Sequence, residues 1–358
     1  MDRSNDHRRT AGRQKMSPET VFWIVLVVIL TLGGAGFWLY SNLDASTEPV
    51  ETVDDITEPV DTEEDVTVPV DIEDDITVPP DIEEPEESDW LPKIPDTHTS
   101  ILLLGLDSYG LSDVIMIISY DMTTYDSSLI SIKRDTFIGD QTWADKNSGL
   151  DHLTFANYFG MGPEKDYHAG ARLATQTIED LLGIELHAYA SITFEGFVDL
   201  VDLIGGVVID VAPGFAEREG GALPTGRQLL MGEQALIYAR HRQNPRIPEP
   251  GSTSQDGDRV RRNQNLLKAI LEQCKTLESD ELLAVVDQLE NKLYTSLDDW
   301  AILELANILY NRDTSAIESV VLPGEGKMVY QTRTENEVYY YFLDFAESNI
   351  ILQELGLK

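Results

Sequence analysis

The stretch ILLLGLDSYGLSDVIMIISYD, residues 101–121, decides the fold. It contains two apolar runs rich in Ile, Leu and Val, at 101–106 and 114–119. Runs of this kind are too short to cross a membrane and are typical of strands buried on both faces. A third run, SLISIK, follows at 128–133. Because the connection between the first two runs is short, their adjoining ends can lie at one edge of a sheet.

Strands and helices alternate along the rest of the outer part of the chain. Further strands are predicted at 186–192, 207–212 and 319–324. Helices are predicted at 169–182, 194–206, 232–239, 259–277, 281–293, 300–310 and 338–355. The alternation predicts an α/β domain, a three-layer α/β/α sandwich with a mixed central sheet. We assign residues 98–325 to this domain and 326–358 to a C-terminal extension that packs on it.

The N-terminal part contains a predicted membrane anchor. Residues 21–40 carry no charged side chain, and a helix of that length spans about 30 Å, the thickness of a bilayer's hydrocarbon core. Residues 1–20 hold five basic and three acidic side chains, so we expect a cytoplasmic tail (1–20) and one transmembrane signal anchor (21–41). A cleaved signal peptide is the alternative, but its apolar region is usually about 7–15 residues long.

Residues 42–97 form a predicted linker. Four ten-residue units repeat between 48 and 87, with Pro at positions 49, 59, 69 and 79. The segment 43–90 holds 20 acidic side chains and no Lys or Arg. Pro blocks helix formation and like charges repel, so we expect a disordered, extended stalk that spaces the outer domain from the membrane.

The composition excludes several classes of protein. The 358 residues carry a net charge of −38, which argues against nucleic acid as a partner because a nucleic-acid binder needs a basic face. More than half of this excess lies in the linker. The single cysteine, Cys274, rules out an internal disulfide framework and a cysteine-rich metal site.

Two carboxylates adjoin the first two predicted strands. Asp107 follows the first strand, and Asp113 precedes the second. A pair of carboxylates with room for water and phosphate oxygens is the kind of site that Mg²⁺ prefers. Aspartates at strand ends and turns are also common without any function, and this explanation stays open at this point.

Arginines gather in a domain that is otherwise acidic. Between 240 and 262 there are six arginines and three acidic residues. The planar guanidinium suits phosphate oxygens, so converging arginines beside a carboxylate pair imply a pyrophosphate or phosphodiester ligand. A solvated or salt-bridged helix face is the alternative. The candidates are Arg134, Arg240, Arg242, Arg259 and Arg262, with Asp135 and Asp256 among them.

Several motifs in this order resemble the LytR–CpsA–Psr family over roughly residues 98–325. They are ILLLGLDS, SDVIMIISYD, SLISIKRDT, GFVDLVDLIGGVVIDV, LMGEQALIYARHR and DGDRVRRNQNLL. The resemblance implies a phosphotransferase of the bacterial cytoplasmic membrane, single-pass, with the N-terminus inside and the catalytic domain outside. Such enzymes move a glycopolymer from undecaprenyl-pyrophosphate onto peptidoglycan, typically onto the 6-hydroxyl of muramic acid.

The resemblance also implies roles for residues. Mg²⁺ would be bound by Asp107 and Asp113. The pyrophosphate would be bound by Arg134, Arg240, Arg242, Arg259 and Arg262. Asp135 or Asp256 would orient an arginine or accept the proton of the acceptor hydroxyl, and the sequence does not choose between these roles. With Arg134, Arg240 and Arg242 they make up the predicted catalytic set.

Three positions depart from the family pattern. Leu111 stands where the family usually has Arg, Lys133 where it has Pro, and Asn263 where it has Gln. Two other functions therefore remain open. The first is hydrolysis of prenyl pyrophosphates at the same site. The second is binding of lipid-linked polymer without catalysis, or regulation, as the family's older label of transcriptional attenuator suggests.

Overall fold

The computed structural model covers most of the outer part of the chain. It describes residues 98–121, 123–139, 144–145, 148–212, 223–241, 255–277, 281, 285, 288–289, 291–297 and 313–358. The predicted tail, anchor and linker lie outside the described residues, as does the helix predicted at 300–310. The helix predicted at 281–293 is described only in part, and its end is wrong, because Leu293 begins a strand. Within the part of the chain that is described, no helix has the length and apolar character needed to cross a membrane.

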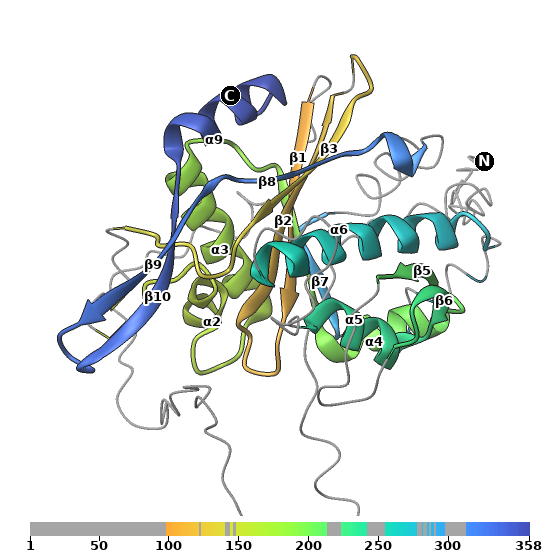
Figure 1. Ribbon diagram of the computed structural model, residues 1–358, viewed down its shortest axis with the longest axis horizontal. Coiled ribbons are helices and arrows are strands. Elements are labelled where there is room, and N and C mark those ends of the chain that lie inside the picture. Colours follow the sequence, from red (N-terminus) through yellow and green to blue (C-terminus); the bar gives the residue numbers. More distant parts are fainter. Residues whose placement is uncertain are drawn as a thin grey trace, which may run out of the picture.

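A six-stranded mixed sheet forms the centre of the fold, in the order β7-β4-β1-β2-β3-β8 (Figure 1). Its strands are β1 (His98–Leu106), β2 (Ser112–Asp121), β3 (Ser127–Ile132), β4 (Ala188–Thr193), β7 (Leu293–Thr295) and β8 (Glu318–Val321). β1 runs parallel to β4, and β3 parallel to β8, whereas β2 is antiparallel to both of its neighbours. The prediction of an α/β domain with a mixed sheet is confirmed.

Helices cover both faces of this sheet. On one face lie α2 (Phe155–Met161), α3 (Tyr167–Leu182) and α9 (Phe345–Glu354); on the other lie α4 (Phe194–Leu203), α5 (Gly232–Arg240) and α6 (Gln255–Cys274) (Figure 1). Side chains alternate along a strand. Leu102 and Leu104 of β1 therefore belong to the hydrophobic core under α2, α3 and α9, while Ile101 and Leu103 belong to the core under α4, α5 and α6. The central strands are therefore buried on both faces, as their continuous apolar runs predict.

Two small ribbons stand beside the sheet. β5 (Val207–Val211) pairs with β6 (Gly226–Leu230), so the strand predicted at 207–212 exists but lies outside the central sheet. β9 (Gly324–Gln331) pairs with β10 (Asn336–Leu343). The prediction of a helix over 338–355 is wrong in its first part, because the aromatic run VYYYFL favours a strand. The helix begins only after Asp344, whose side chain caps it by accepting from the N–H of Glu347.

The predicted site residues that adjoin the first three strands lie at one edge of the sheet. The parallel strands β1, β3 and β4 all end there, and the antiparallel β2 begins there. Residues that follow β1 and β3 and those that open β2 are thus brought together by the strand order alone. The helices α4 and α5 border the same edge, since α4 follows β4 directly and packs against α5.

Candidate functional site

A β-bulge positions Asp113 at this edge. In the pairing of β1 with β2, Gly105 lies opposite Val114 and Leu106 opposite Ser112, so Asp113 has no partner residue on β1. Such an extra residue bends the strand and redirects its side chain. Arg134, two residues after β3, donates from Nη1 to Oδ1 of Asp113 at 2.5 Å. The bulge thus brings the carboxylate to the arginine that follows the neighbouring strand.

The loop from 107 to 111 holds the second carboxylate. Oδ1 of Asp107 accepts from the backbone N–H groups of Tyr109 (2.9 Å) and Leu111 (2.8 Å). The loop needs Gly110, because its φ is +87° and a Cβ there would lie 2.5 Å from Cε of Met161. Asn157 of α2 secures the loop by donating to the carbonyl of Gly110 at 2.8 Å. The short connection thereby fixes the direction of the Asp107 side chain.

The two carboxylates share one electrostatic environment. Burial raises the pKa of Asp107 to about 6; the negative charge of Asp113 acts in the same direction, and the loop N–H groups and Arg134 oppose it. Two carboxylates that repel each other in a partly buried site provide the charge and the oxygens that a divalent cation takes. The described residues hold no group of three or more His, Cys, Asp or Glu suited to a metal ion. A cation here would therefore need water or phosphate oxygens as further ligands, which is the usual situation of Mg²⁺.

Thr154 joins the two halves of this site. Its N–H donates to the carbonyl of Arg134 at 3.0 Å, and its carbonyl accepts from the N–H of Ser112 at 3.0 Å. Its hydroxyl donates to the carbonyl of Ser112 at 3.1 Å. Thr154 therefore fixes the backbone beside Asp113 and the backbone of Arg134 at once. No motif in the sequence marks Thr154 or Asn157, because both act on backbone groups far away along the chain.

Asp135 lies next to Arg134 at the same edge. Oδ1 of Asp135 is 3.4 Å from Nε of Arg134, and both side chains keep about a quarter of their surface exposed (26% and 24%). The backbone of Asp135 is fixed by β10, because its carbonyl accepts from the N–H of Tyr341 at 2.8 Å. The guanidinium of Arg134 thus lies between two carboxylates, which limits its orientation.

The predicted arginines on α5 and α6 take two different positions. Arg259 is largely buried, and its Nη1 donates to the backbone carbonyl of Asp113 at 3.4 Å. Arg262 is 2% exposed and donates to the carbonyls of Tyr238 (3.2 Å) and His241. These carbonyls end α5, so Arg262 caps the helix whose last residue is Arg240. Both guanidinium groups therefore contact backbone, but Arg259 contacts that of Asp113, beside the carboxylate pair, whereas Arg262 contacts that of the end of α5.

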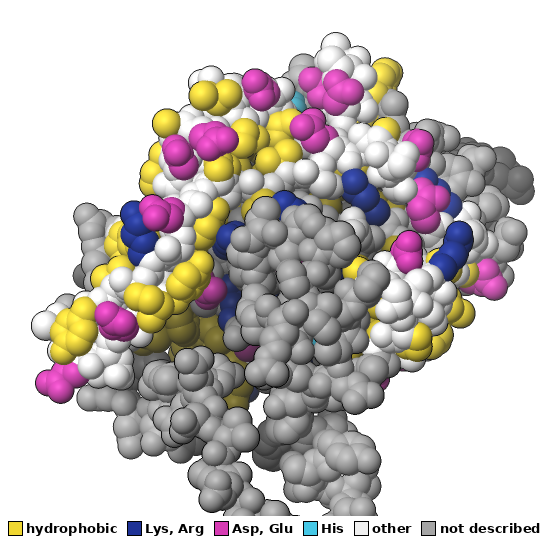
Figure 2. Space-filling model, viewed as in Figure 1, with side chains coloured by type: hydrophobic (Ala, Val, Ile, Leu, Met, Phe, Trp, Pro, Cys, Tyr) yellow, Lys and Arg dark blue, Asp and Glu magenta, His cyan; other side chains and the backbone are white. Residues whose placement is uncertain are grey.

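Arg240 lies near the end of β4. It is exposed, and its Cζ is 5.6 Å from the ring centre of Phe194, the first residue of α4. Arg242 lies outside the described residues, and so does the side chain of Asp256, whose backbone belongs to α6. Figure 2 shows several Lys and Arg side chains in the middle of one face, with acidic side chains scattered around them. Asp107, Asp113, Arg134, Asp135 and Arg259 are thus brought together, with Arg240 on a bordering helix.

The three departures from the family pattern have structural roles or a buried position. Nζ of Lys133 lies 4.0 Å from the ring centre of Tyr341, a cation–π contact that joins the end of β3 to β10. The backbone of Leu111 accepts from the N–H of Asp107 and donates to Oδ1 of its side chain. Asn263 is 3% exposed. None of these substitutions removes a residue of the carboxylate pair.

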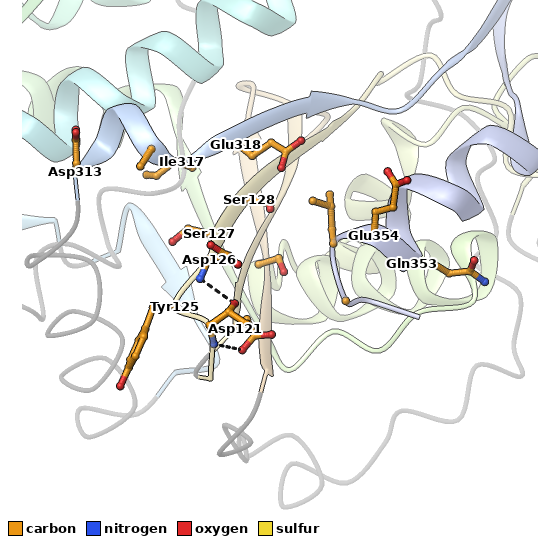
Figure 3. Close-up of a pocket in the computed structure, with 15 residues that line it drawn as sticks. Asp121, Tyr125, Asp126, Ser127, Ser128, Asp313, Ile317, Glu318, Gln353 and Glu354 are labelled. Atoms are coloured by element: carbon orange, nitrogen blue, oxygen red, sulfur yellow. Dashed lines mark hydrogen bonds between the residues drawn. The ribbon is translucent and has the colours of Figure 1, made fainter.

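A cavity of about 390 Å³ lies at the opposite end of the sheet (Figure 3). It is lined by the β2–β3 turn, the start of β8 and the end of α9. Its lining contains five acidic residues and no Lys or Arg, so it is unsuited to a phosphate group. Two of these carboxylates accept hydrogen bonds within their own turns. Asp121 accepts from the backbone N–H groups of Thr123 and Thr124, and Asp313 accepts from that of Ser315.

The chain is similar to curated proteins over most of its length. It is 26% identical to the polyisoprenyl-teichoic acid–peptidoglycan teichoic acid transferase TagU of Oceanobacillus iheyensis, covering 98% of this chain and 97% of that protein. It is 29% identical to the protein of the same name from Enterococcus faecalis, covering 72% of this chain and 78% of that protein.

Solved structures share the fold. B. subtilis TagV superposes with a TM-score of 0.57 at 22% identity, covering 73% of this chain and 97% of that one. TagT bound to LIIa-WTA superposes with a TM-score of 0.53 at 22% identity, covering 76% of this chain and 92% of that one. The model of the LytR_cpsA_psr family matches residues 66–355. With this match over most of its length, and with the ordered motifs assembled at one sheet edge, the chain belongs to the LytR_cpsA_psr family.

Proposed function

We propose that this protein is a membrane-anchored phosphotransferase that moves a glycopolymer from undecaprenyl-pyrophosphate onto peptidoglycan. The observation that carries the proposal is the meeting of Asp107, Asp113 and Arg134 at one sheet edge, with Arg259 bound to the same strand. Family membership and relatives named as teichoic acid transferases support it. The anchor, 21–41, would keep the enzyme in the bacterial cytoplasmic membrane near its lipid substrate.

Asp107 and Asp113 would hold Mg²⁺. The fit rests on the raised pKa of Asp107, which reflects burial and the neighbouring charge of Asp113. When bound, the cation would neutralise charge on the phosphate oxygens. Arg134 and Arg259 would contact the same oxygens, because both reach Asp113 from neighbouring elements. Arg240 and Arg242 would bind the pyrophosphate from the end of α5, as the family pattern predicts.

Arg262 would act through the backbone. The family pattern makes it a pyrophosphate ligand, and this stays a prediction. Its two hydrogen bonds to the last carbonyls of α5 favour a positioning role, because they fix the end of the helix from which Arg240 projects.

The reaction is a displacement at phosphorus. The oxygen of an acceptor hydroxyl forms a bond to the phosphorus that carries the glycopolymer, the bond from that phosphorus to the bridging oxygen breaks, and undecaprenyl phosphate leaves. Positioning and charge neutralisation are the main contributions of the protein to such a transfer. The proton of the hydroxyl passes to a carboxylate, Asp135 or Asp256, or to solvent. The 3.4 Å contact between Asp135 and Arg134 favours an orienting role for Asp135.

The test uses the purified full chain with a lipid-pyrophosphate-linked glycan, Mg²⁺ and peptidoglycan oligomers. We expect covalent transfer that Asp107→Ala and Arg259→Ala each reduce by at least a hundredfold. Arg333→Ala is the matched control, because Arg333 is 67% exposed, lies in the turn between β9 and β10 and pairs with Asp145. Equal activity in all variants would refute the assignment of the site.

Product analysis separates the two other functions. Release of prenyl phosphate at the same rate with and without a sugar acceptor would indicate a hydrolase. Retained affinity for prenyl pyrophosphate without any turnover would indicate a binding or regulatory protein. Recovery of the parent chain in the soluble fraction, beginning after residue 40, would refute the membrane anchor.

A further inference from the structure

Two tyrosines to which the proposed reaction assigns no role stack on each other. Tyr167 is the first residue of α3, and Tyr294 lies in β7, the edge strand of the sheet. Their ring centres are 4.4 Å apart and their planes differ by 7°. Both side chains are half-buried, so part of the pair is open to solvent. We call this pair the aromatic platform.

Neighbouring groups hold the platform in place. The ring of His168 lies perpendicular to that of Tyr294, with 5.6 Å between ring centres. Nδ1 of His168 is 3.0 Å from the hydroxyl of Tyr189, which lies in the core. The hydroxyl of Tyr294 donates to the carbonyl of Asn291 at 2.7 Å. A rigid aromatic surface loses little conformational entropy when a ligand packs on it.

The platform lies within electrostatic range of the carboxylate pair. The pKa of Tyr167 is raised by burial and, in second place, by the negative charge of Asp107. Another aromatic side chain, Tyr109, projects from the loop that binds Asp107 and is 67% exposed. The loop of Asp107 therefore carries exposed aromatic surface, and the charge of Asp107 also acts on Tyr167 of the platform.

Both substrates of the proposed reaction carry sugar rings next to the reacting groups. One face of a pyranose ring presents C–H groups, and such a face packs well on an aromatic ring. We propose that the aromatic platform binds a pyranose ring of a glycan entering the candidate site. This inference rests on the proposed function. The ring belongs either to the glycopolymer attached to pyrophosphate or to the peptidoglycan acceptor, and the chemistry of recognition is the same for both.

The experiment compares the full-length parent with Tyr167→Leu, Tyr167→Phe and Tyr167→Trp. Leucine keeps apolar volume against Tyr294 but removes the flat ring, whereas Phe and Trp keep it. We expect Tyr167→Leu to raise KM about fivefold for one substrate, which corresponds to about 1 kcal/mol, with kcat within about twofold of the parent. The Phe and Trp variants should keep the parent's KM. A rise in donor KM assigns the ring to the glycopolymer, and a rise in acceptor KM assigns it to peptidoglycan.

Tyr125→Ala is the control, because Tyr125 is 55% exposed in the turn at the opposite end of the sheet. Unchanged KM values in Tyr167→Leu, or a loss of kcat with a lower Tm in all three variants, would overturn the inference in favour of a packing role. A direct measurement separates this failure from failure of the proposed function. Saturation-transfer NMR with the peptidoglycan disaccharide and with a donor-type disaccharide should show contact with the parent and much less with Tyr167→Leu, even if no transfer occurs. Equal signals from both proteins would also overturn it.

Discussion

Replacing Asp107 with Asn is expected to stabilise the metal-free protein at pH 7 while abolishing transfer. The pKa of Asp107 is raised from its usual 3.8 to about 6 by burial and by Asp113. Because a tenfold change in an equilibrium constant corresponds to about 1.4 kcal/mol, the ionised carboxylate destabilises the fold by on the order of 3 kcal/mol. The variant keeps an oxygen that can accept from the N–H groups of Tyr109 and Leu111.

The pH dependence follows from the direction of this pKa difference. An acid with a raised pKa binds its proton more tightly in the folded than in the unfolded state. Its contribution to stability therefore falls as pH rises from about 4 to about 6, and the full cost is present above that range. The advantage of Asp107→Asn should thus be largest at pH 7 and close to zero near pH 3.5.

Urea unfolding of the full chain in EDTA, followed by near-ultraviolet circular dichroism at both pH values, measures this difference. Adding Mg²⁺ at pH 7 should stabilise the parent and leave the variant unchanged, because binding to the folded state alone raises its stability. Asp126→Asn, in an exposed turn, is the control with the same change of charge. A variant that is less stable than the parent at pH 7 would refute the electrostatic account of the site.

Three further outcomes are expected from other parts of the fold. Gly110→Ala should destabilise the protein by more than 1 kcal/mol, because φ is +87° and the new Cβ would meet Met161; urea midpoints measure this, and no change would contradict the loop geometry. Arg262→Ala should lower the free energy of unfolding by about 2 kcal/mol, because it leaves two carbonyls at the end of α5 without the hydrogen bonds of Arg262. Amide hydrogen exchange at the end of α5 should become faster, and unaltered protection would exclude the capping role. The pKa of His98 is lowered by burial and by His187, and that of His187 by burial, so the contribution of these two histidines to stability should fall as pH drops below about 6.5. Comparison of His98→Gln with the parent should show a smaller loss on acidification in the variant, and identical slopes would contradict this account.

Local pattern predicted the elements that carry the site. The apolar runs around 101–106, 114–119 and 128–133 became three neighbouring strands, and the short connection between the first two brought Asp107 and Asp113 to one edge, as expected. The prediction failed where tertiary pairing overrode helical spacing. Residues 336–343 form β10 because β9 and the segment around Thr136 offer partners for a strand.

The residue types at the site could be predicted from the sequence, but the contacts that each arginine makes could not. Arg259 and Arg262 stand on one predicted helix face, yet one contacts the strand of Asp113 and the other caps α5. This difference depends on where α5 ends, which is set by packing between segments far apart along the chain. The bulge at Asp113 likewise depends on pairing between two strands.

The sequence by itself determined the central strands, the family and the residue types available for binding a pyrophosphate, because these follow from local apolar patterns and ordered motifs. Only the tertiary structure decided that Thr154 joins Ser112 to Arg134, and that Tyr167 stacks on Tyr294. The physical reason is that hydrogen bonds and ring contacts between distant segments depend on how strands and helices pack, which no local pattern of residues specifies.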